Sequence, residues 1–327
     1  MRQAARVGVF ASLLIASACL AANAFAASCR FVKIATLPIE FKGRSPVIDG
    51  SVNGHAMTVL VDSGASATSL TRSLADRAGL ALSHSNTTSF GVGGESQRYT
   101  ARVDEVSFGP VRWKRANLAV VWSLSANAPL DALLGADFLF SNDIEMVWSE
   151  KQIRFFQPEG CADAFLAYWD GDASVVAMSV MGPGDSRQVI TVEVNGTKMR
   201  ALIDSGASHS VIDSAAAARV GVTPTSSSAI RTGKTGGIGM RDVDTWSAAF
   251  ERVSIGAETI ENTRLTVMDM WGAVRADSNN WATAEMIADQ PEMLLGADFL
   301  RSHRVLFAAS QRRFYFSYIG GAVFQAD

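Results

Sequence analysis

The sequence predicts an all-β protein built from two similar halves, and three observations carry this prediction. The string Asp-Ser-Gly-Ala-Ser occurs at 62–66 and again at 204–208. The heptad Leu-Leu-Gly-Ala-Asp-Phe-Leu occurs at 133–139 and again at 294–300. Between these motifs, short β-branched or apolar runs alternate with Gly, Pro, Asn and Ser, which is the pattern of strands joined by turns.

The repeat continues outside the two motifs. Two shorter strings also recur: Val-Asn-Gly at 52–54 and 194–196, and Val-Ser-Phe-Gly or Val-Ser-Ile-Gly at 106–109 and 253–256. The pentapeptides lie 142 residues apart (204 − 62), and the chain has 327 residues, enough for two domains of ordinary size. We therefore expect an N-terminal lobe at 27–163 and a C-terminal lobe at 164–327.

Residues 1–26 are expected to form a secretory signal peptide. Arg2 and Arg6 supply the positive start, residues 7–20 the apolar stretch, and Ala-Phe-Ala at 24–26 a small-x-small cleavage site. An uncleaved membrane anchor is the alternative, although the apolar stretch is short for a membrane span. No later stretch is long and apolar enough for one, so we expect an exported protein, periplasmic or secreted, without stable membrane insertion.

The three cysteines lead to two expectations. Cys19 allows a lipid-modified N-terminus as a further alternative to cleavage. Cleavage after the signal would leave only Cys29 and Cys161, and an even pair in an exported protein predicts a disulfide. The bridge would enclose the first half, and the alternative is two unlinked thiols.

Composition excludes several other classes of function. The formal charge is −3 and there is no Lys/Arg run, so nucleic acid is not an expected partner. The four histidines show no metal-ligand spacing, so no metal is expected. Residues 228–235 resemble a phosphate-binding loop but have Ser where the first Gly is required. The sequence therefore predicts neither a metal nor an organic cofactor.

The expected elements are mostly strands with few helices. Helices are expected at 69–78 and 210–220, because Gly79 and Gly221 follow them as stop signals, and short ones after the Gly of each heptad. The expected strands lie at 31–41, 47–52, 57–61, 102–108, 118–122 and 153–156.

Linkers and insertions separate the halves. The boundary is expected near 158–161, with a candidate second linker at 182–185. From the Asp to the Gly of the heptad, the second half is longer by 19 residues, since 62 to 135 is 73 and 204 to 296 is 92. Fourteen of these lie between 265 and 296, and they form either a specificity loop or lid, or a plain surface excursion.

Each pentapeptide provides a carboxylate at the end of a strand. Two such loops facing each other about a twofold axis would bring Asp62 and Asp204 together, where they cannot both ionise readily and so share one proton. Such a pair can deprotonate a water and protonate a substrate carbonyl. The flanking Ser can hydrogen-bond the loop, and the Gly leaves room for a second backbone. These supporting residues are Ser63, Gly64, Ser205 and Gly206.

The two motifs and their order resemble the retropepsin-like aspartic proteases. The resemblance covers nearly all of the chain after residue 30, in a single-chain tandem form similar to the two-lobed arrangement of pepsin. It implies two β-barrel lobes with an Asp62/Asp204 catalytic dyad between them, and Ser63 and Ser205 in the hydrogen-bond network beneath. The implied reaction is hydrolysis of peptide bonds in a peptide or protein substrate by a monomer.

The resemblance also places a glycine-rich flap in each half. No residue is assigned to the part of the pepsin flap tyrosine, although Tyr99 follows the first flap and Arg241 and Trp246 lie near the second. The glycines expected in the flaps are Gly91, Gly93, Gly94, Gly236, Gly237 and Gly239.

Three further polar residues have a simpler expected role. Asp137 and Asp298 of the heptads open helical turns, which indicates capping or first-turn roles rather than a catalytic pair. His209 is expected on the surface, with the cleft rim as the alternative.

Two alternatives to this interpretation stay open. A catalytically inactive peptide- or protein-binding module could use the same scaffold, although binding alone requires no acidic pair. Each lobe could also pair with the same lobe of a second chain, although the unequal insertions favour pairing within one chain.

Overall fold

The computed structural model describes residues 29–122, 130–277 and 287–324, so the expected signal peptide at 1–26 lies outside the described residues. The strands of the first half are β1 (Arg30–Pro38), β2 (Glu40–Lys42), β3 (Ser45–Val52), β4 (His55–Val61), β5 (Ser69–Thr71), β6 (Leu82–Gly91), β7 (Gly94–Phe108), β8 (Val111–Val121), β9 (Ala132–Leu134), β10 (Asp143–Val147) and β11 (Gln152–Glu159). Those of the second half are β12 (Ser174–Gly182), β13 (Asp185–Val194), β14 (Thr197–Ile203), β15 (Val211–Asp213), β16 (Ile230–Thr235), β17 (Val243–Ile255), β18 (Glu258–Met268), β19 (Met293–Leu295), β20 (His303–Ala308) and β21 (Arg313–Tyr318). The helices are α1 (Arg72–Arg77), α2 (Ala136–Leu139), the 3-10 turn η1 (Trp148–Glu150), α3 (Ser214–Arg219), α4 (Gly272–Asp277) and α6 (Ala297–Ser302).

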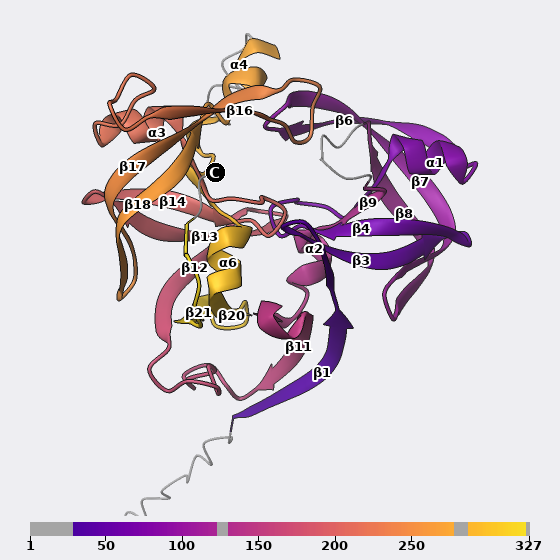
Figure 1. The fold of residues 1–327 in the computed structure, drawn as a ribbon. Coiled ribbons are helices and arrows are strands. Elements are labelled where there is room, and N and C mark those ends of the chain that lie inside the picture. Colours follow the sequence, from indigo (N-terminus) through magenta and orange to yellow (C-terminus); the bar gives the residue numbers. More distant parts are fainter. Residues whose placement is uncertain (1–28, 123–129, 278–286, 325–327) are drawn as a thin grey trace, which may run out of the picture.

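The fold is all-β and bilobal, as predicted (Figure 1). In each lobe, the strand that precedes an Asp pairs in parallel with the strand of a heptad: β4 with β9, and β14 with β19. The same order of strands follows in both halves, with β3–β4 and β13–β14 as antiparallel hairpins. The two copies of the sequence repeat therefore form two copies of one sheet topology.

A shared sheet joins the two lobes. β10 of the first half pairs antiparallel with β20 of the second, with Ile144 opposite Phe307 and Met146 opposite Val305. β1 and β11 extend this sheet on one side, and β21 and β12 extend it on the other. The lobes of one chain are thus joined by backbone hydrogen bonds as well as by side-chain packing.

Several expected elements differ at their boundaries. The expected strand at 31–41 is two strands, β1 and β2, interrupted at Ile39, whose N–H bonds to Lys151 O (2.9 Å). The expected helices at 69–78 and 210–220 were too long, because their first residues form the buried strands β5 and β15. Each helix starts only after an N-cap: Thr71 accepts from Leu74 N–H, and Asp213 accepts from Ala215 N–H.

The candidate second linker at 182–185 is wrong. Gly182 pairs with Asp185 across the turn of the β12–β13 hairpin. Gly184, with φ of +78°, supplies the left-handed residue that this turn needs. A Gly-Pro-Gly-Asp run signals a turn as readily as a linker, and only the strand pairing on either side separates the two.

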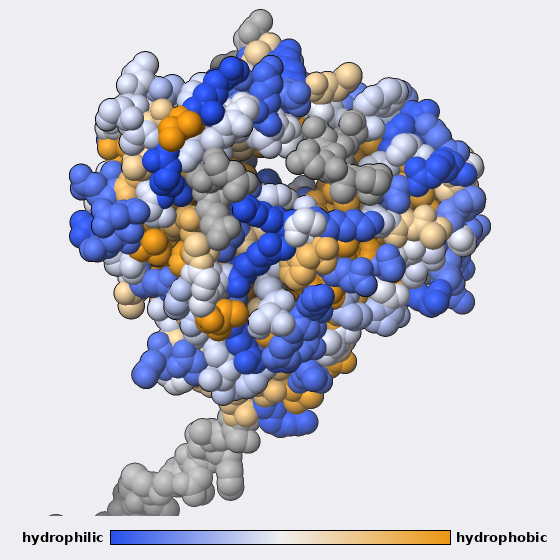
Figure 2. All heavy atoms as spheres, viewed as in Figure 1, coloured by the Kyte–Doolittle hydropathy of each residue, from blue (hydrophilic) through white to orange (hydrophobic). Residues whose placement is uncertain are grey.

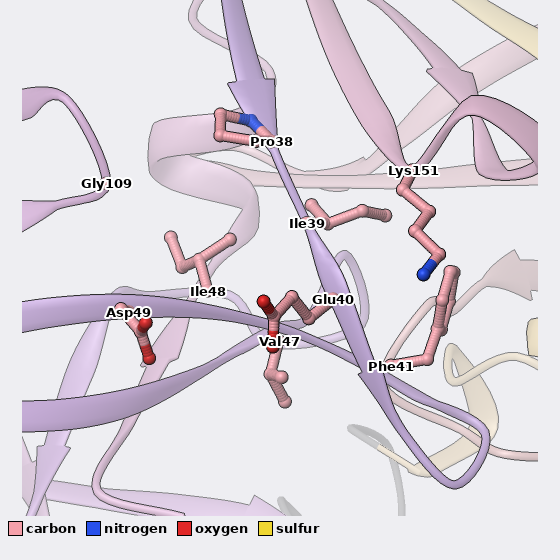
Figure 3. A pocket seen from close by; sticks show the side chains of 9 residues that line it. All are labelled: Pro38, Ile39, Glu40, Phe41, Val47, Ile48, Asp49, Gly109 and Lys151. Atoms are coloured by element: carbon pink, nitrogen blue, oxygen red, sulfur yellow. The ribbon is translucent and has the colours of Figure 1, made fainter.

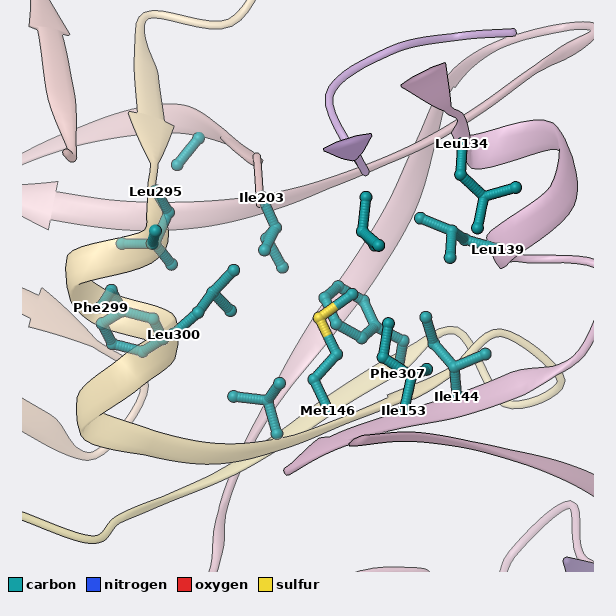
Figure 4. Packing of buried hydrophobic residues seen from close by; sticks show 14 of the residues in the cluster. Leu134, Leu139, Ile144, Met146, Ile153, Ile203, Leu295, Phe299, Leu300 and Phe307 are labelled. Atoms are coloured by element: carbon teal, nitrogen blue, oxygen red, sulfur yellow. The ribbon is translucent and has the colours of Figure 1, made fainter. Parts of the chain in front are cut away.

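The main hydrophobic core contains residues from both halves (Figure 4), and it includes Val61 and Ile203, which directly precede the two Asp residues. Leu134 and Met146 of the first half pack in the same cluster as Ile203, Leu295 and Phe307 of the second. All five are fully buried, and each such side chain stabilises the fold by about 1.5–3 kcal/mol. This core holds the two loops in a fixed relation to each other.

The predicted disulfide between Cys29 and Cys161 is confirmed. It joins the residue before β1 to the residues that follow β11, its antiparallel partner strand. None of the helices in residues 29–122, 130–277 and 287–324 has the length and apolar character that a membrane crossing needs.

A buried carboxylate stabilises the shared sheet, and its removal is expected to destabilise the protein strongly. Glu145 on β10 is 0 % exposed and contacts Arg154 (3.2 Å), Tyr168 Oη (2.8 Å) and Arg304 Nε (2.6 Å). Glu145→Ala would leave two arginines without this partner, so the free energy of unfolding should fall by about 3–5 kcal/mol. Denaturant titration measures this change.

The control for this experiment is Glu150→Ala. Glu150 also pairs with Arg154, but its side chain is 46% exposed, so its loss should cost about 1 kcal/mol or less. A Glu145→Ala variant as stable as the Glu150→Ala variant would contradict a stabilising role for the buried carboxylate.

Candidate active site

The two Asp residues lie where parallel strands end side by side. Asp62 follows β4 and its N–H bonds to Leu134 O (3.0 Å); Asp204 follows β14 and its N–H bonds to Leu295 O (2.9 Å). The carboxylate of each Asp accepts two hydrogen bonds from backbone N–H groups of its own loop, from residues 64 and 65 or from 206 and 207, at 2.9–3.1 Å. These bonds fix the orientation of both carboxylates.

The serines of the pentapeptides bond the two loops to each other. The hydroxyl of Ser63 donates to Ile203 O (2.8 Å) and accepts from Ser205 N–H (2.9 Å). The hydroxyl of Ser205 donates to Val61 O (2.8 Å) and accepts from Ser63 N–H (3.0 Å). Both side chains are fully buried, so this reciprocal network, expected from the sequence, rigidly couples the lobes at the site.

The glycines of the pentapeptides allow this close approach. A Cβ at Gly64 would lie 2.3 Å from Asp204 Cγ, and a Cβ at Gly206 would lie 2.5 Å from Asp62 Cγ. Any larger residue would collide with the carboxylate of the opposite lobe. The Gly of each motif is therefore required by the other half of the chain.

The two carboxyl groups are hydrogen-bonded to each other, and their pKa values are raised. Burial raises the pKa of Asp62 well above its usual 3.8, and the charge of Asp204 raises it further. Burial also raises the pKa of Asp204, but bonds from Ala207, Asp62 and Gly206 and the charge of Arg187 oppose this shift. The pair therefore holds one shared proton.

This shared proton predicts how stability depends on pH. A carboxyl whose pKa is raised by folding stabilises the fold below its unfolded pKa, and that contribution is lost as pH rises through the folded pKa. Asp62→Asn removes a group that is costly to ionise, so at neutral pH the variant should be more stable than the wild type. The difference should shrink towards pH 3.8, which thermal unfolding across pH can measure. A stability difference that does not change with pH would contradict the shared proton.

Each heptad packs behind the loop of its own half. A Cβ at Gly135 would lie 2.6 Å from Ala67 C, and one at Gly296 would lie 2.5 Å from His209 C. The next residue then donates its N–H to the loop: Ala136 to Ala65 O and Ala297 to Ala207 O, both at 2.8 Å. The heptads are supports for the loops that carry the two Asp residues.

The acidic residues of the heptads lie in the first turns of α2 and α6, as expected, where they accept from Phe138 N–H (2.9 Å) and Phe299 N–H (2.8 Å) of their own helices. Asp137 accepts from the N–H and hydroxyl of Thr68 (2.8 and 2.7 Å). Asp298 accepts from the N–H and hydroxyl of Ser210 (2.9 and 2.6 Å). Sequence reasoning missed Thr68 and Ser210, although they occupy matched positions six residues after each Asp. The N-cap positions belong to Gly135 and Gly296.

The glycine-rich segments form two loops that meet above the site. The first flap loop is the β6–β7 turn, where Gly91 pairs with Gly94; the second is the segment 236–242 between β16 and β17. Gly93 N–H donates to Ile238 O (2.9 Å), and Gly93 and Gly239 form a bridge. In Figure 1 the hairpins of β6 and β16 extend towards each other, and Figure 2 shows a hollow between the two lobes.

The tips of the flap loops carry apolar side chains that sequence reasoning missed. Val92 packs with an apolar cluster of the second lobe that includes Val189, Leu202, Val211 and Leu294. Ile238 packs with an apolar cluster of the first lobe, which consists of Val47, Leu60, Ala65 and Leu133 together with Leu130. Each flap loop thus contacts the apolar wall of the opposite lobe. Their positions between glycines gave no signal of this packing.

Three further residues considered from sequence are Tyr99, Trp246 and His209. The ring of Tyr99 packs at a tilt against His84 within the β6–β7 hairpin, and Trp246 lies on β17. His209 is half-buried rather than on the surface, with its Nδ1 2.8 Å from Nη1 of Arg44 on the first lobe.

A separate groove lies on the first lobe (Figure 3). It has a volume of about 570 Å³ and is lined in part by Glu40, Asp49 and Lys151, but not by Asp62 or Asp204. Within the part of the chain that the structure describes, no three His, Cys, Asp or Glu side chains are placed to hold a metal ion together. The carboxyl pair is therefore the strongest candidate for chemistry.

Comparison with known proteins agrees with this geometry. A family model described as "Aspartyl protease" matches residues 48–138 and 190–299, one region in each half. Among solved structures, the chain is similar to the aspartic proteinase from Irpex lacteus, with 15% identity and a TM-score of 0.50 over 87% of this chain and 97% of that chain. This second likeness shows the fold alone, and no curated protein matches the sequence significantly. The family match covers more than half of the chain, and the protein is therefore a member of the aspartyl protease family with two tandem copies of the family's domain.

Proposed function

We propose that the protein is an aspartic endopeptidase that uses Asp62 and Asp204 to activate a water molecule against a peptide bond. The observation that carries this proposal is the hydrogen-bonded carboxyl pair, contributed by both lobes and lying beneath the two flap loops. A partly shared proton gives the site both a general acid and a general base at the same pH.

The two roles are divided between the members of the pair. The ionised carboxylate accepts a proton from water as the water oxygen attacks the carbonyl carbon, and the protonated carboxyl donates its proton to the carbonyl oxygen, which gives a tetrahedral gem-diol. When the C–N bond breaks, the first carboxyl returns a proton to the leaving nitrogen, and the second regains one from a hydroxyl. The pair ends with one proton, as it began.

The apolar walls on either side of the pair support a preference for substrates with apolar side chains around the scissile bond. We further propose that the substrate is a peptide or protein, that the enzyme is exported by the segment at 1–26, and that it acts as a monomer. Support for the last point is that both Asp loops and the shared sheet pair within one chain.

The test is cleavage of a proteome-derived peptide library by the purified mature chain from about pH 3 to about pH 8, read by mass spectrometry. We expect cuts on the acidic side of this range, flanked by apolar residues. A folded wild-type chain that cuts nothing at any pH would favour the alternative, an inactive peptide-binding module on the same scaffold.

A further inference from the structure

The insertion of the second half forms a helix above the flap loops. The extra 14 residues between 265 and 296 include the region of α4 (Gly272–Asp277). Figure 1 shows α4 above β16, on the side of the flap loops away from the body of the molecule. α4 packs against the start of β7, the outgoing strand of the first flap loop. The insertion therefore contacts a loop of the opposite lobe.

One side chain of this helix contacts both flap loops. Oδ2 of Asp277 accepts a hydrogen bond from Glu95 N–H of the first loop (3.0 Å). Oδ1 of the same carboxylate pairs with Nη2 of Arg241 of the second loop (2.5 Å). Arg241 also donates to Ala273 O on α4 (3.0 Å), so two bonds attach the second loop to the insertion.

The backbone at Gly94 leaves the space that the Asp277 carboxylate occupies. Gly94, beside Glu95, has a φ of +103°, and a Cβ there would lie 2.4 Å from Asp277 Oδ2. The two loops are also bonded directly, because the N–H groups of Met240 and Arg241 donate to Gly93 O (3.1 and 3.0 Å). A single carboxylate thus fixes a pair of loops that already form one bonded unit.

We propose that Asp277 is a positioning residue that latches both flap loops closed over the cleft. This inference rests on the proposed function, since it assigns to the insertion control of substrate retention at the same site. Asp277 does not contact the carboxyl pair, so its loss should leave the chemical step intact. Loss of the latch lowers the population of closed loops and weakens apparent substrate binding in proportion.

Hydrogen exchange of the flap amides tests the latch without any need for activity. Asp277→Ala should speed exchange at residues 93–95 and 240–241 by about tenfold, the effect expected from loss of a charge-assisted hydrogen bond. Asp277→Asn keeps an oxygen that can accept from Glu95 but loses the charge, so its effect should be smaller. The matched control is Asp269→Asn, which removes the same charge from a neighbouring surface pair with Arg275.

Kinetics with a cleaved peptide give the second measurement. Asp277→Ala should raise KM about fivefold and leave kcat within about twofold of the wild type. Flap exchange no faster in Asp277→Ala than in Asp269→Asn would overturn the latch. A fall in kcat with unchanged KM would overturn its positioning role. If the wild-type chain cleaves nothing, the proposed function fails separately, and the exchange measurement still decides whether the latch exists.

Discussion

Asp62→Asn and Asp204→Asn are each expected to lower kcat by about a thousandfold or more, because each removes one half of the acid–base pair. With Asn at either position, the pair can no longer supply both a base for the water and an acid for the carbonyl oxygen. The neutral amide occupies nearly the same volume, so both variants should fold. Cleavage of a library-derived peptide at the optimal pH measures the loss, and circular dichroism confirms the fold.

The control for this pair is Asp172→Asn, an exposed position in the chain between β11 and β12. It should cleave at the wild-type rate. If either variant at 62 or 204 retained more than about a tenth of wild-type kcat, the assignment of that residue would be wrong.

Gly64→Ala and Gly206→Ala are expected to be nearly as damaging. The new Cβ would lie 2.3–2.5 Å from the opposite carboxyl carbon, so the two loops must move apart. A displacement of about 1 Å at reacting groups can cost a hundredfold in rate, and overpacking of this kind costs about 1–3 kcal/mol of stability. Both kcat/KM and the melting temperature should therefore fall.

Gly182→Ala provides the matched control for these glycines. A Cβ there meets no atom within 4 Å, so both activity and stability should stay at wild-type levels. If Gly64→Ala and Gly206→Ala behaved like Gly182→Ala, the close approach of the loops would not be needed for function. Because each glycine faces the Asp of the other lobe, the two variants should also have similar effects.

The duplicated halves form a site with approximate twofold symmetry, but the chain segments around the site differ between the halves. The carboxyl pair, the serine network and the supports behind the loops occur in matched copies. The insertion that carries α4 belongs to the second half and contacts both flap loops. The groups that occur in both halves thus have roles in the proposed chemistry. The insertion that carries α4, which occurs only in the second half, has a role in the proposed control of access to the cleft.

Much of the fold and the candidate site could be predicted from the sequence, because residues with the same role in both loops occur in both copies of the repeat. Asp62, Asp204 and their neighbouring serines and glycines were identified from the repeated pentapeptide, and the pairing of Cys29 with Cys161 from the cysteine count. Strand positions followed from local apolar patterns. These features depend on local chemistry or on an exact repeat, both of which are visible along the chain.

Other features depend on contacts between residues far apart in sequence. The start of α1 and α3 was placed too early because the preceding triplets pair in the sheet with residues 50 (119 − 69) and 55 (266 − 211) positions away. The roles of Asp137 and Asp298 depend on Thr68 and Ser210. The pairing of β5 with β9 and of β15 with β19 brings these residues near the heptads. The packing of Val92 and Ile238 and the contacts of Asp277 cross from one lobe to the other. The local sequence thus determined which chemical groups the chain carries. Tertiary packing alone decided which of these groups are in contact, because hydrogen bonds and apolar contacts depend on distance in space rather than on separation along the chain.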